Sequence, residues 1–370
     1  MIYLDHGATS FPKPGVVTQA MADAMAACAN PGRGGHDAAQ AGAKAVYSCR
    51  ERAAELFDCQ PEQVVFTSNC THGLNVAIHT LVRPGGRVVI SGFEHNAVTR
   101  PLHNRRARVT VAGERLFDWD DTLRTFRRAL NRGVDAAIFT HTSNVFGYVL
   151  PVKEMAQMCR RRGVPFIIDA AQSAGMEDVS LKELGADFIA MPGHKGLLGP
   201  MGTGLLLCSR LPKPFLCGGT GSDSMIQSMP DYLPDRAEAG TVNVPGIAGL
   251  EAGIRTVQRL GPAKIGKKER DLAASAGQML ENLGLEVFRG EHQAGTVSFR
   301  ARLDCEEVAE ALAQEGIAVR AGLHCAPLAH KSAGTLDTGT VRLSFGYDSD
   351  ESQLPELERA VRTRILTGNP

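Results

Sequence analysis

The sequence predicts an α/β protein in which helices cover both faces of a mostly parallel sheet, followed by a smaller α+β unit. Near-continuous apolar runs alternate with helical stretches in the first part of the chain, and this pattern changes after about residue 255. Apolar runs of this kind are typical of parallel strands, because helices bury them on both faces. We therefore expect a large domain over 16–255 and a small domain formed by 1–15 together with 256–370.

The individual elements follow from the spacing of apolar residues. Ala-rich, amphipathic stretches predict helices over 16–28 and 37–58, the second with Asp37 as its N-cap. Apolar runs predict strands at 64–68, 87–91, 136–141, 165–170, 187–191 and 204–209, separated by helical stretches such as TLRTFRRAL and VKEMAQMCRRRG. In the last part of the chain, GTVSFRA and TVRLSFGY alternate with the helical segments DCEEVAEALAQEG and ESQLPELERAVRTRIL.

Composition narrows the class of protein. The 370 residues carry 40 Lys and Arg against 40 Asp and Glu, so neither a nucleic-acid partner nor a membrane surface is expected. No apolar run approaches the ~20 residues that a membrane helix needs. Nine cysteines without CxxC spacing indicate reduced thiols, with no disulfide framework and no metal site. Together with an N-terminus that lacks signal-peptide features, this predicts a cytoplasmic protein.

Polar side chains follow the carboxyl ends of the predicted strands, where ligands bind in a doubly wound sheet. They are the small-polar turn SNCTHGLN (68–75), His95, Asn144, Asp169 with Gln172, and His194 with Lys195. Taken singly, each has an ordinary explanation, such as a helix cap, a loop histidine or a surface charge.

Taken together, these residues match the needs of pyridoxal phosphate. Its aldehyde requires a lysine such as Lys195, and its pyridine nitrogen requires a carboxylate such as Asp169. The phosphate would suit the helix N-terminus after residue 69, where backbone N–H groups are free. Gln172 could contact the phenolic oxygen, and His95 could stack on the ring. The sequence therefore predicts a pyridoxal 5'-phosphate site.

Longer motifs extend this interpretation over nearly the whole chain. They are YLDHGATS, NPGRGGH, NCTHGLN, EHNA, SNVFG, DAAQ, GHKGLLGPMGTG, AGTVN and RAGLHCAP. With these motifs the chain resembles the class V aminotransferase fold family, most closely the cysteine desulfurases and selenocysteine lyases of the sulfur-assembly type. The resemblance implies the fold type I of pyridoxal-phosphate-dependent transferases and a homodimer.

The resemblance also implies roles for individual residues. Lys195 would hold the cofactor covalently, and His95 would be a catalytic proton donor as well as the ring's stacking partner. The other expected cofactor contacts are Asp169, Gln172, His194, Cys70, Thr71 and, from the partner subunit, Thr241. The expected substrate contacts are Asn144, Arg320, Arg33 and Arg342, which would bind the substrate carboxylate.

Three positions depart from the family's pattern around the phosphate. Pro192 stands where a serine or threonine is usual, Cys70 replaces a threonine, and His72 stands where a glutamate is common. Two side-chain hydroxyls that would bind the phosphate are therefore missing, and another group such as a backbone N–H must bind it instead.

The stretch RAGLHCAPLAH distinguishes between the reactions that this scaffold supports. Cys325 follows a strand-like run, with His324 beside it and Arg320 five residues earlier, and cations of this kind favour a thiolate. By resemblance, the Cys325 thiolate attacks the sulfur of L-cysteine, leaving L-alanine and a persulfide that passes to a protein acceptor of unknown identity.

Other functions use the same residues and stay open at this point. A selenocysteine lyase would act on L-selenocysteine, and a class V relative that performs β-elimination or epimerisation would not need Cys325. A non-catalytic scaffold is the weakest alternative, because Lys195, Asp169 and His95 are all intact.

Overall fold

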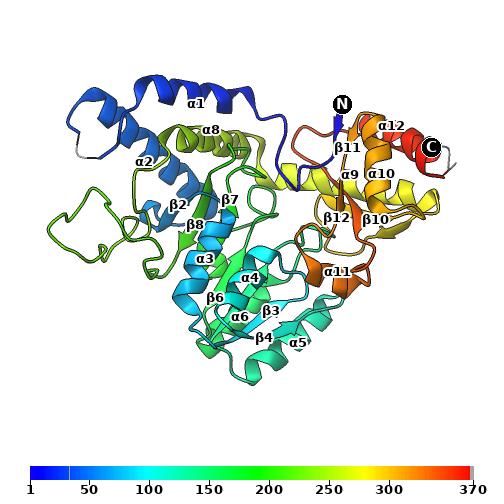
Figure 1. The fold of residues 1–370 in the computed structure, drawn as a ribbon, viewed down its shortest axis with the longest axis horizontal. Coiled ribbons are helices and arrows are strands. Elements are labelled where there is room, and N and C mark those ends of the chain that lie inside the picture. The colour runs from blue at the N-terminus through cyan, green and yellow to red at the C-terminus, as the bar shows by residue number, and fades with distance from the viewer. Residues whose placement is uncertain (33, 367–370) are drawn as a thin grey trace.

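A seven-stranded sheet forms the centre of the computed structural model, which describes residues 1–32 and 34–366 (Figure 1). Its strand order is β2-β8-β7-β6-β5-β3-β4, and β8 alone runs antiparallel to its neighbours. The strands are β2 (Val64–Thr67), β3 (Arg87–Ser91), β4 (Arg108–Ala112), β5 (Ala136–Thr140), β6 (Phe166–Asp169), β7 (Phe188–Pro192) and β8 (Gly204–Cys208). The sheet is mostly parallel, as predicted.

Helices cover both faces of this sheet, which explains its apolar strands. In β5, Ala137 and Phe139 face one hydrophobic cluster, whereas Ala136 and Ile138 face another. The first cluster is closed by α2 (Asp37–Phe57), α5 (Trp119–Asn131), α6 (Val152–Arg162), the short α7 (Leu181–Leu184) and α8 (Val244–Leu260). The second is closed by α3 (Cys70–Leu81) and α4 (Asn96–Asn104). Helix α1 (Gly15–Ala27) packs on α8.

Two local predictions need correction. Strand β4 was not predicted, because it lies at the sheet edge and begins with the exposed pair Arg108 and Val109, so its sequence RVTVA is not continuously apolar. The N-cap of α2 is His36, whose Nδ1 accepts the N–H of Ala39 at 3.4 Å, and Asp37 is the first helical residue.

The last part of the chain forms a smaller α+β unit around its own core. An antiparallel sheet, β12-β13-β10-β9, packs against α9 and α10 (Figure 1). Its elements are α9 (Pro262–Asn282), β9 (Glu286–Phe288), β10 (Thr296–Arg300), α10 (Cys305–Gln314), β12 (Arg320–Gly322), α11 (Pro327–Ala333), β13 (Thr340–Ser344) and α12 (Gln353–Ala360). The N-terminal strand β1 (Ile2–Tyr3) pairs with β11 (Ile317–Ala318), and Leu4 enters the core of this unit. The proposed boundary at residue 255 falls inside α8.

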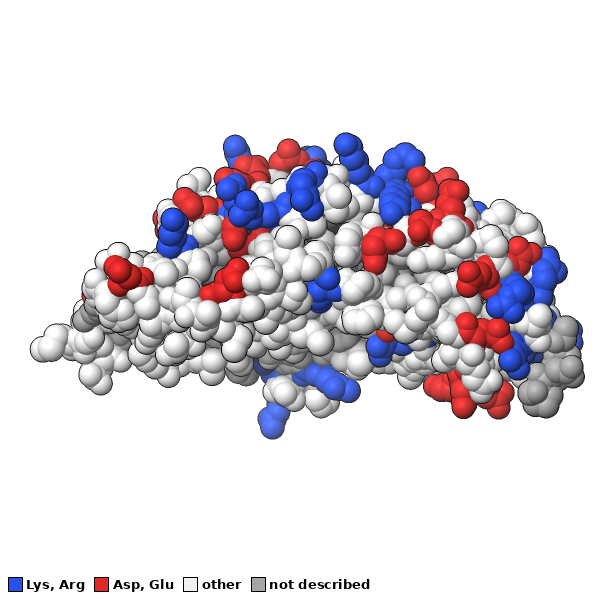
Figure 2. Space-filling view, turned by 90° about the horizontal axis from the view of Figure 1, so that it is seen from above, with Lys and Arg blue, Asp and Glu red and all other residues white. Residues whose placement is uncertain are grey.

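The surface differs from one side of the molecule to the other. Seen from above, charged side chains of both signs are mixed along one margin and at the small unit, whereas the opposite end is largely uncharged (Figure 2). A long segment between β8 and α8 extends from that end (Figure 1). Among the described residues, we find no helix with the length and apolarity that a membrane crossing requires.

Candidate active site

A cavity of about 310 Å³ lies where the carboxyl ends of the main strands meet the small unit. Its walls come from β5, β6 and β7 on one side and from the β12–α11 segment and β13 on the other. The structure brings together most of the predicted site residues in this cavity: Cys70, Thr71, His95, Asn144, Asp169, Gln172, His194, Lys195, Arg320, Cys325 and Arg342.

Lys195 lies in the turn after β7, and Asp169 ends the neighbouring strand β6. Burial and the nearby Arg342 cation lower the pKa of Lys195 to about 8, so roughly a tenth of its amine is neutral at pH 7, far more than for an ordinary lysine. Asp169 Oδ1 accepts the N–H of Ala171 at 2.9 Å, which fixes the carboxylate at the cavity wall. A nucleophilic amine and an oriented carboxylate thus share one cavity.

The N-terminus of α3 opens into the same cavity. Asn69 caps this helix by accepting the N–H of His72 at 2.9 Å, and Asn69, Cys70 and Thr71 line the cavity. The Cys70 thiol donates to Asp169 Oδ1 at 3.4 Å, and burial, reinforced by Asp169, raises its pKa well above the usual range. Cys70 is therefore a neutral thiol bonded to the acid. It supplies no hydroxyl at the helix N-terminus, where the backbone N–H groups remain as donors for an anion.

The two predicted histidines are neutral and held in place. His95 caps α4 by accepting the N–H of Ala97 on Nδ1 at 3.0 Å, and burial lowers its pKa. Burial, with help from Lys195 and Lys13, lowers the pKa of His194 to about 4. Among the described residues, the buried Nδ1 of His194 has no hydrogen-bond partner. This nitrogen is available to a ligand.

An acid that sequence reasoning did not select connects the two arginines of the cavity. Asp5 Oδ1 accepts from Arg342 Nη2 at 2.7 Å, and Asp5 Oδ2 lies 2.8 Å from Arg320 Nη2. Arg342 Nη1 also donates to the backbone oxygen of Asn144 at 2.9 Å. The buried Nε of Arg342 has no partner within the described chain, so it can donate to a substrate carboxylate. The motif YLDHGATS contains Asp5, but no local spacing links it to either arginine.

Cys325 lies in a tight turn between β12 and α11. The N–H of Ala326 donates to the carbonyl of Leu323 at 2.8 Å, and the two residues between them have positive φ, 49° for His324 and 56° for Cys325. Two consecutive left-handed residues are typical of a type I′ turn, and such non-glycine conformations occur where the surrounding structure enforces them. Cys325 is exposed while lining the cavity, so its sulfur is open both to a bound substrate and to solvent.

Neighbouring segments hold this turn through its backbone. The side-chain amide of Asn144 donates to the carbonyl of His324 at 2.7 Å, and the N–H of Asn96 donates to the carbonyl of Cys325 at 2.7 Å. His324 itself lies 3.2 Å from the carbonyl of Thr340, and burial lowers its pKa to about 2. The expectation that His324 supplies a cation to the thiolate is therefore wrong, because a buried neutral imidazole carries no charge. Arg320 is the charged neighbour.

One described residue of the predicted set does not line this cavity, and another predicted residue is not described. Thr241 is exposed and lines two other cavities, one of them shared with Thr71. Arg33 lies outside the described residues. Gln172 is in the cavity, where one of its amide hydrogens is used by the carbonyl of Gly7 at 2.9 Å.

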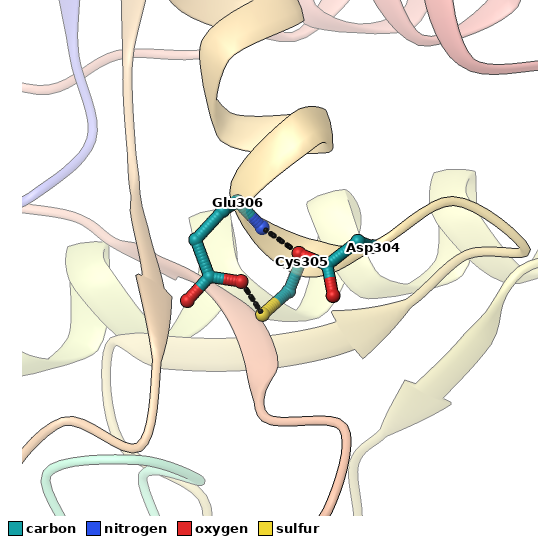
Figure 3. Close-up of side chains that lie close together, drawn as sticks. All are labelled: Asp304, Cys305 and Glu306. Atoms are coloured by element: carbon teal, nitrogen blue, oxygen red, sulfur yellow. Dashed lines mark hydrogen bonds between the residues drawn. The ribbon is translucent and has the colours of Figure 1, made fainter.

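A second thiol lies among acids at the start of α10 (Figure 3). Asp304 caps the helix by accepting the N–H of Glu306 at 2.9 Å, and the Cys305 thiol donates to Glu306 Oε2 at 3.0 Å (Figure 3). Burial, with help from this hydrogen bond, raises the pKa of Cys305 to about 11. This group is a helix cap with a protonated thiol, and thiolate is the form in which cysteine acts as a metal ligand.

Comparison with known proteins agrees with this geometry. The family model Aminotransferase class-V matches residues 2–357. A probable cysteine desulfurase of Methanothermobacter thermautotrophicus is 34% identical, over 95% of this chain and 92% of the relative. Another, from Pyrococcus abyssi, is 32% identical over 98% and 95%. The apo structure of cysteine desulfurase from Thermococcus onnurineus NA1 superposes with a TM-score of 0.91 at 29% identity, covering 99% of this chain and 95% of that one. These findings confirm the predicted family and fold class.

Proposed function

Because the chain belongs to the aminotransferase class-V family, we propose that it is a cysteine desulfurase that depends on pyridoxal phosphate. It would convert L-cysteine to L-alanine and leave the sulfur as a persulfide on Cys325. The observation that carries this proposal is the shared cavity, in which an exposed cysteine in an enforced turn accompanies Lys195 and a buried arginine. Desulfurase names recur among the full-length relatives, which supports the same reaction.

The cavity fits pyridoxal phosphate. Lys195 would hold its aldehyde carbon, Asp169 its pyridine nitrogen and His95 one face of its ring. Pro192 and Cys70 do not supply the side-chain hydroxyls that would bind the cofactor phosphate. The N-terminus of α3 and the unpartnered Nδ1 of His194 would bind the phosphate in their place. When bound, this cofactor stabilises negative charge at the α-carbon of an amino acid.

Residues of the chain carry out substrate binding, proton transfer and attack on the substrate sulfur. Arg342 binds the substrate carboxylate through its free Nε, and Lys195 removes the α-proton, which its lowered pKa permits near neutral pH. Cys325 Sγ, as the thiolate, attacks the substrate sulfur, so that an S–S bond forms as the substrate's C–S bond breaks. His95, held at the cavity wall, donates a proton to the product carbon.

Several further features belong to the same proposal. The exposed Cys325 would pass its persulfide to the thiol of an acceptor protein. The enzyme would be a homodimer in which Thr241 approaches the partner's cofactor phosphate, and it would act in the cytoplasm. The cysteines of the described residues are all free, which agrees with a reducing compartment.

The decisive experiment measures both products and the trapped sulfur. Incubation with L-cysteine should release sulfide, in the presence of a thiol reductant, and alanine in equal amounts. Cys325→Ser should lose sulfide release at least about 100-fold, because a hydroxyl stays protonated and attacks sulfur poorly. It should still bind the cofactor, as seen in its visible absorbance. Alkylation after a substrate pulse should place the extra sulfur on the peptide containing Cys325.

Cys217→Ser is the matched control, because Cys217 is also exposed but does not line the cavity. Its turnover should equal that of the wild type. Wild-type sulfide release by Cys325→Ser would overturn the proposed reaction. Turnover of L-selenocysteine by Cys325→Ser would instead identify a lyase that does not need the thiol.

A further inference from the structure

The edge of the main sheet opposite the cavity concentrates arginines that are far apart in the sequence. Strands β3 and β4 begin at this edge, and helices α4, α5 and α6 return to it, because consecutive parallel strands need such crossovers. These elements lie in the lower part of Figure 1. We define the arginine edge as Arg83, Arg87, Arg105, Arg106, Arg108, Arg132, Arg160, Arg161 and Arg162.

Backbone register and hydrogen bonds show that this edge is continuous. Arg87 and Arg108 are register partners on adjacent strands. Arg87 Nη1 donates to the backbone oxygen of Arg132 at 3.2 Å, where α5 ends. Arg162 Nη2, at the end of α6, donates to Asn131 Oδ1 at 2.9 Å. The side chains therefore form one ridge across β4, β3, α5 and α6.

Among the described residues, two nearby acids offset little of the charge of the ridge, because one pairs with a single ridge arginine and the other with an arginine outside the ridge. Asp135 accepts the N–H of Arg87 at 2.8 Å and pairs with Arg83 at 3.6 Å. Asp187 accepts the N–H of Phe166 at 2.8 Å and pairs with Arg210 at 2.8 Å. The whole chain has no net charge, yet this edge is strongly positive.

Part of the ridge has a structural explanation and part does not. Arg105 Nη2 donates to the carbonyl of His79, so Arg105 satisfies a helix C-terminus. The side chains of Arg106, Arg132 and Arg161 are exposed and make no hydrogen bond or ion pair within the described chain. Arg106 also has φ of 52° just after α4, where glycine is preferred, so local backbone preference does not select an arginine there.

We propose that the arginine edge binds the phosphate backbone of a nucleic acid. Guanidinium groups bind phosphates through paired N–H donors, and protein–nucleic acid interfaces are polar and positive. A protein partner would need an apolar centre. Within the described β3, β4, α4, α5 and α6, Val109 is the one exposed large hydrophobic residue, and its exposed fraction is 42%. The neutral composition predicted no such partner, because composition does not report how charge is sorted in space.

The test measures binding of the cofactor-loaded protein to labelled RNA and DNA duplexes of about 20 base pairs and identical sequence. The triple variant Arg106→Glu, Arg132→Glu, Arg161→Glu should bind at least about 10-fold more weakly than the wild type. Each lost phosphate contact should also reduce the slope of log affinity against log salt by about 0.9. The matched control reverses three exposed cations elsewhere, Arg259, Lys264 and Arg302, and should bind within about 3-fold of the wild type.

The outcomes separate this proposal from the proposed enzyme activity. Sulfide release and melting temperature should be unchanged in both triple variants, because none of the six residues lines the cavity. Tighter binding of RNA than DNA would assign the edge to A-form duplexes, and equal binding would assign it to the shared backbone. The proposal is overturned if the wild type binds neither duplex at low salt, if the control loses as much affinity, or if polyglutamate binds more tightly than the duplexes and depends on the same three arginines.

Discussion

Asp5 shows how one residue can organise a binding site without touching the substrate. It accepts from Arg342 at 2.7 Å and from Arg320 at 2.8 to 3.2 Å, and these arginines are register partners on β13 and β12. Without an acid between them, the two cations would repel each other in a cavity with little water. Asp5 therefore holds Arg342 in place while the Nε of Arg342 keeps no partner among the described residues.

Asp5→Asn should raise the KM for L-cysteine about 10-fold, because the amide cannot balance two guanidinium groups, and this corresponds to about 1.4 kcal/mol of binding. The kcat should change less than about 3-fold, since Lys195 and Cys325 are untouched. Steady-state kinetics check this split. Asp348→Asn is the control, because Asp348 is an acid of the same region that pairs with His6 instead. An equal loss of kcat and kcat/KM would show that Asp5 acts in the chemistry itself.

The same residue marks a limit of sequence reasoning. Arg320 and Arg342 were predicted as substrate contacts, but their acid lies 315 and 337 residues away in the chain. No periodicity or local motif reports contacts over such separations. Lys195, Asp169 and His95 could be predicted because each lies at or shortly after the end of an apolar run, and the carboxyl ends of parallel strands meet at one edge of the sheet.

At the scale of elements, the turn that carries Cys325 is fixed by segments from elsewhere. Asn144 follows β5 and holds the carbonyl of His324, while the N-terminus of α4 holds the carbonyl of Cys325. The sequence predicted Asn144 in the site, yet its described hydrogen bonds go to the cysteine turn and to Arg342. Sequence alone did not show this arrangement. Asn144 binds a backbone carbonyl at His324 and the side chain of Arg342, and both residues are far from it in the chain.

Glu94, which follows β3, connects two central strands, and we expect it to make the stability of the fold depend on pH. Its Oε1 accepts from Ser91 and from the N–H of Thr140 at 2.8 Å, whereas its buried Oε2 has no partner among described residues. Burial raises the pKa of Glu94 to about 8, so the folded protein keeps a proton that the unfolded chain loses near its ordinary pKa. Between these two pKa values the folded state binds more protons, and stability must fall as pH rises.

Glu94→Gln should remove this dependence, because glutamine does not titrate. The unfolding free energy of the wild type relative to Glu94→Gln should fall between about pH 5 and pH 8, by roughly 3 to 4 kcal/mol, and then level off. Denaturant unfolding at several pH values measures the difference. Glu183→Gln, at an exposed ion pair with Lys153, should track the wild type throughout. A constant difference between wild type and Glu94→Gln would show that Glu94 is charged in the folded protein at all these pH values.

At the scale of the whole molecule, the sequence could not reveal where charged and apolar side chains gather on the surface. Balanced totals of acid and base concealed the arginine edge. They also concealed a largely uncharged end of the molecule (Figure 2). Exposed apolar side chains occur near that end on α1, α2 and the segment before α8, among them Met25 at 73%, Tyr47 at 52% and Met225 at 94%. Where such side chains form one patch, they mark an association surface. Tyr47 lines the same surface cavity as Thr241.

We expect this surface to form the homodimer. Sedimentation equilibrium should give twice the chain mass of 39.5 kDa. A site that two subunits share needs an obligate interface, and obligate interfaces typically bury more than ~2,000 Å² and keep the dimer intact. Tyr47→Asp should shift the protein toward monomer, since an unpaired carboxylate would be buried at the centre of the interface. Its sulfide release should fall together with the dimer fraction, because Thr241 would no longer reach the partner's phosphate site. Leu303→Asp, at a half-exposed position on the small unit, should stay dimeric and active. A Tyr47→Asp monomer with wild-type turnover would show that each subunit completes its own site.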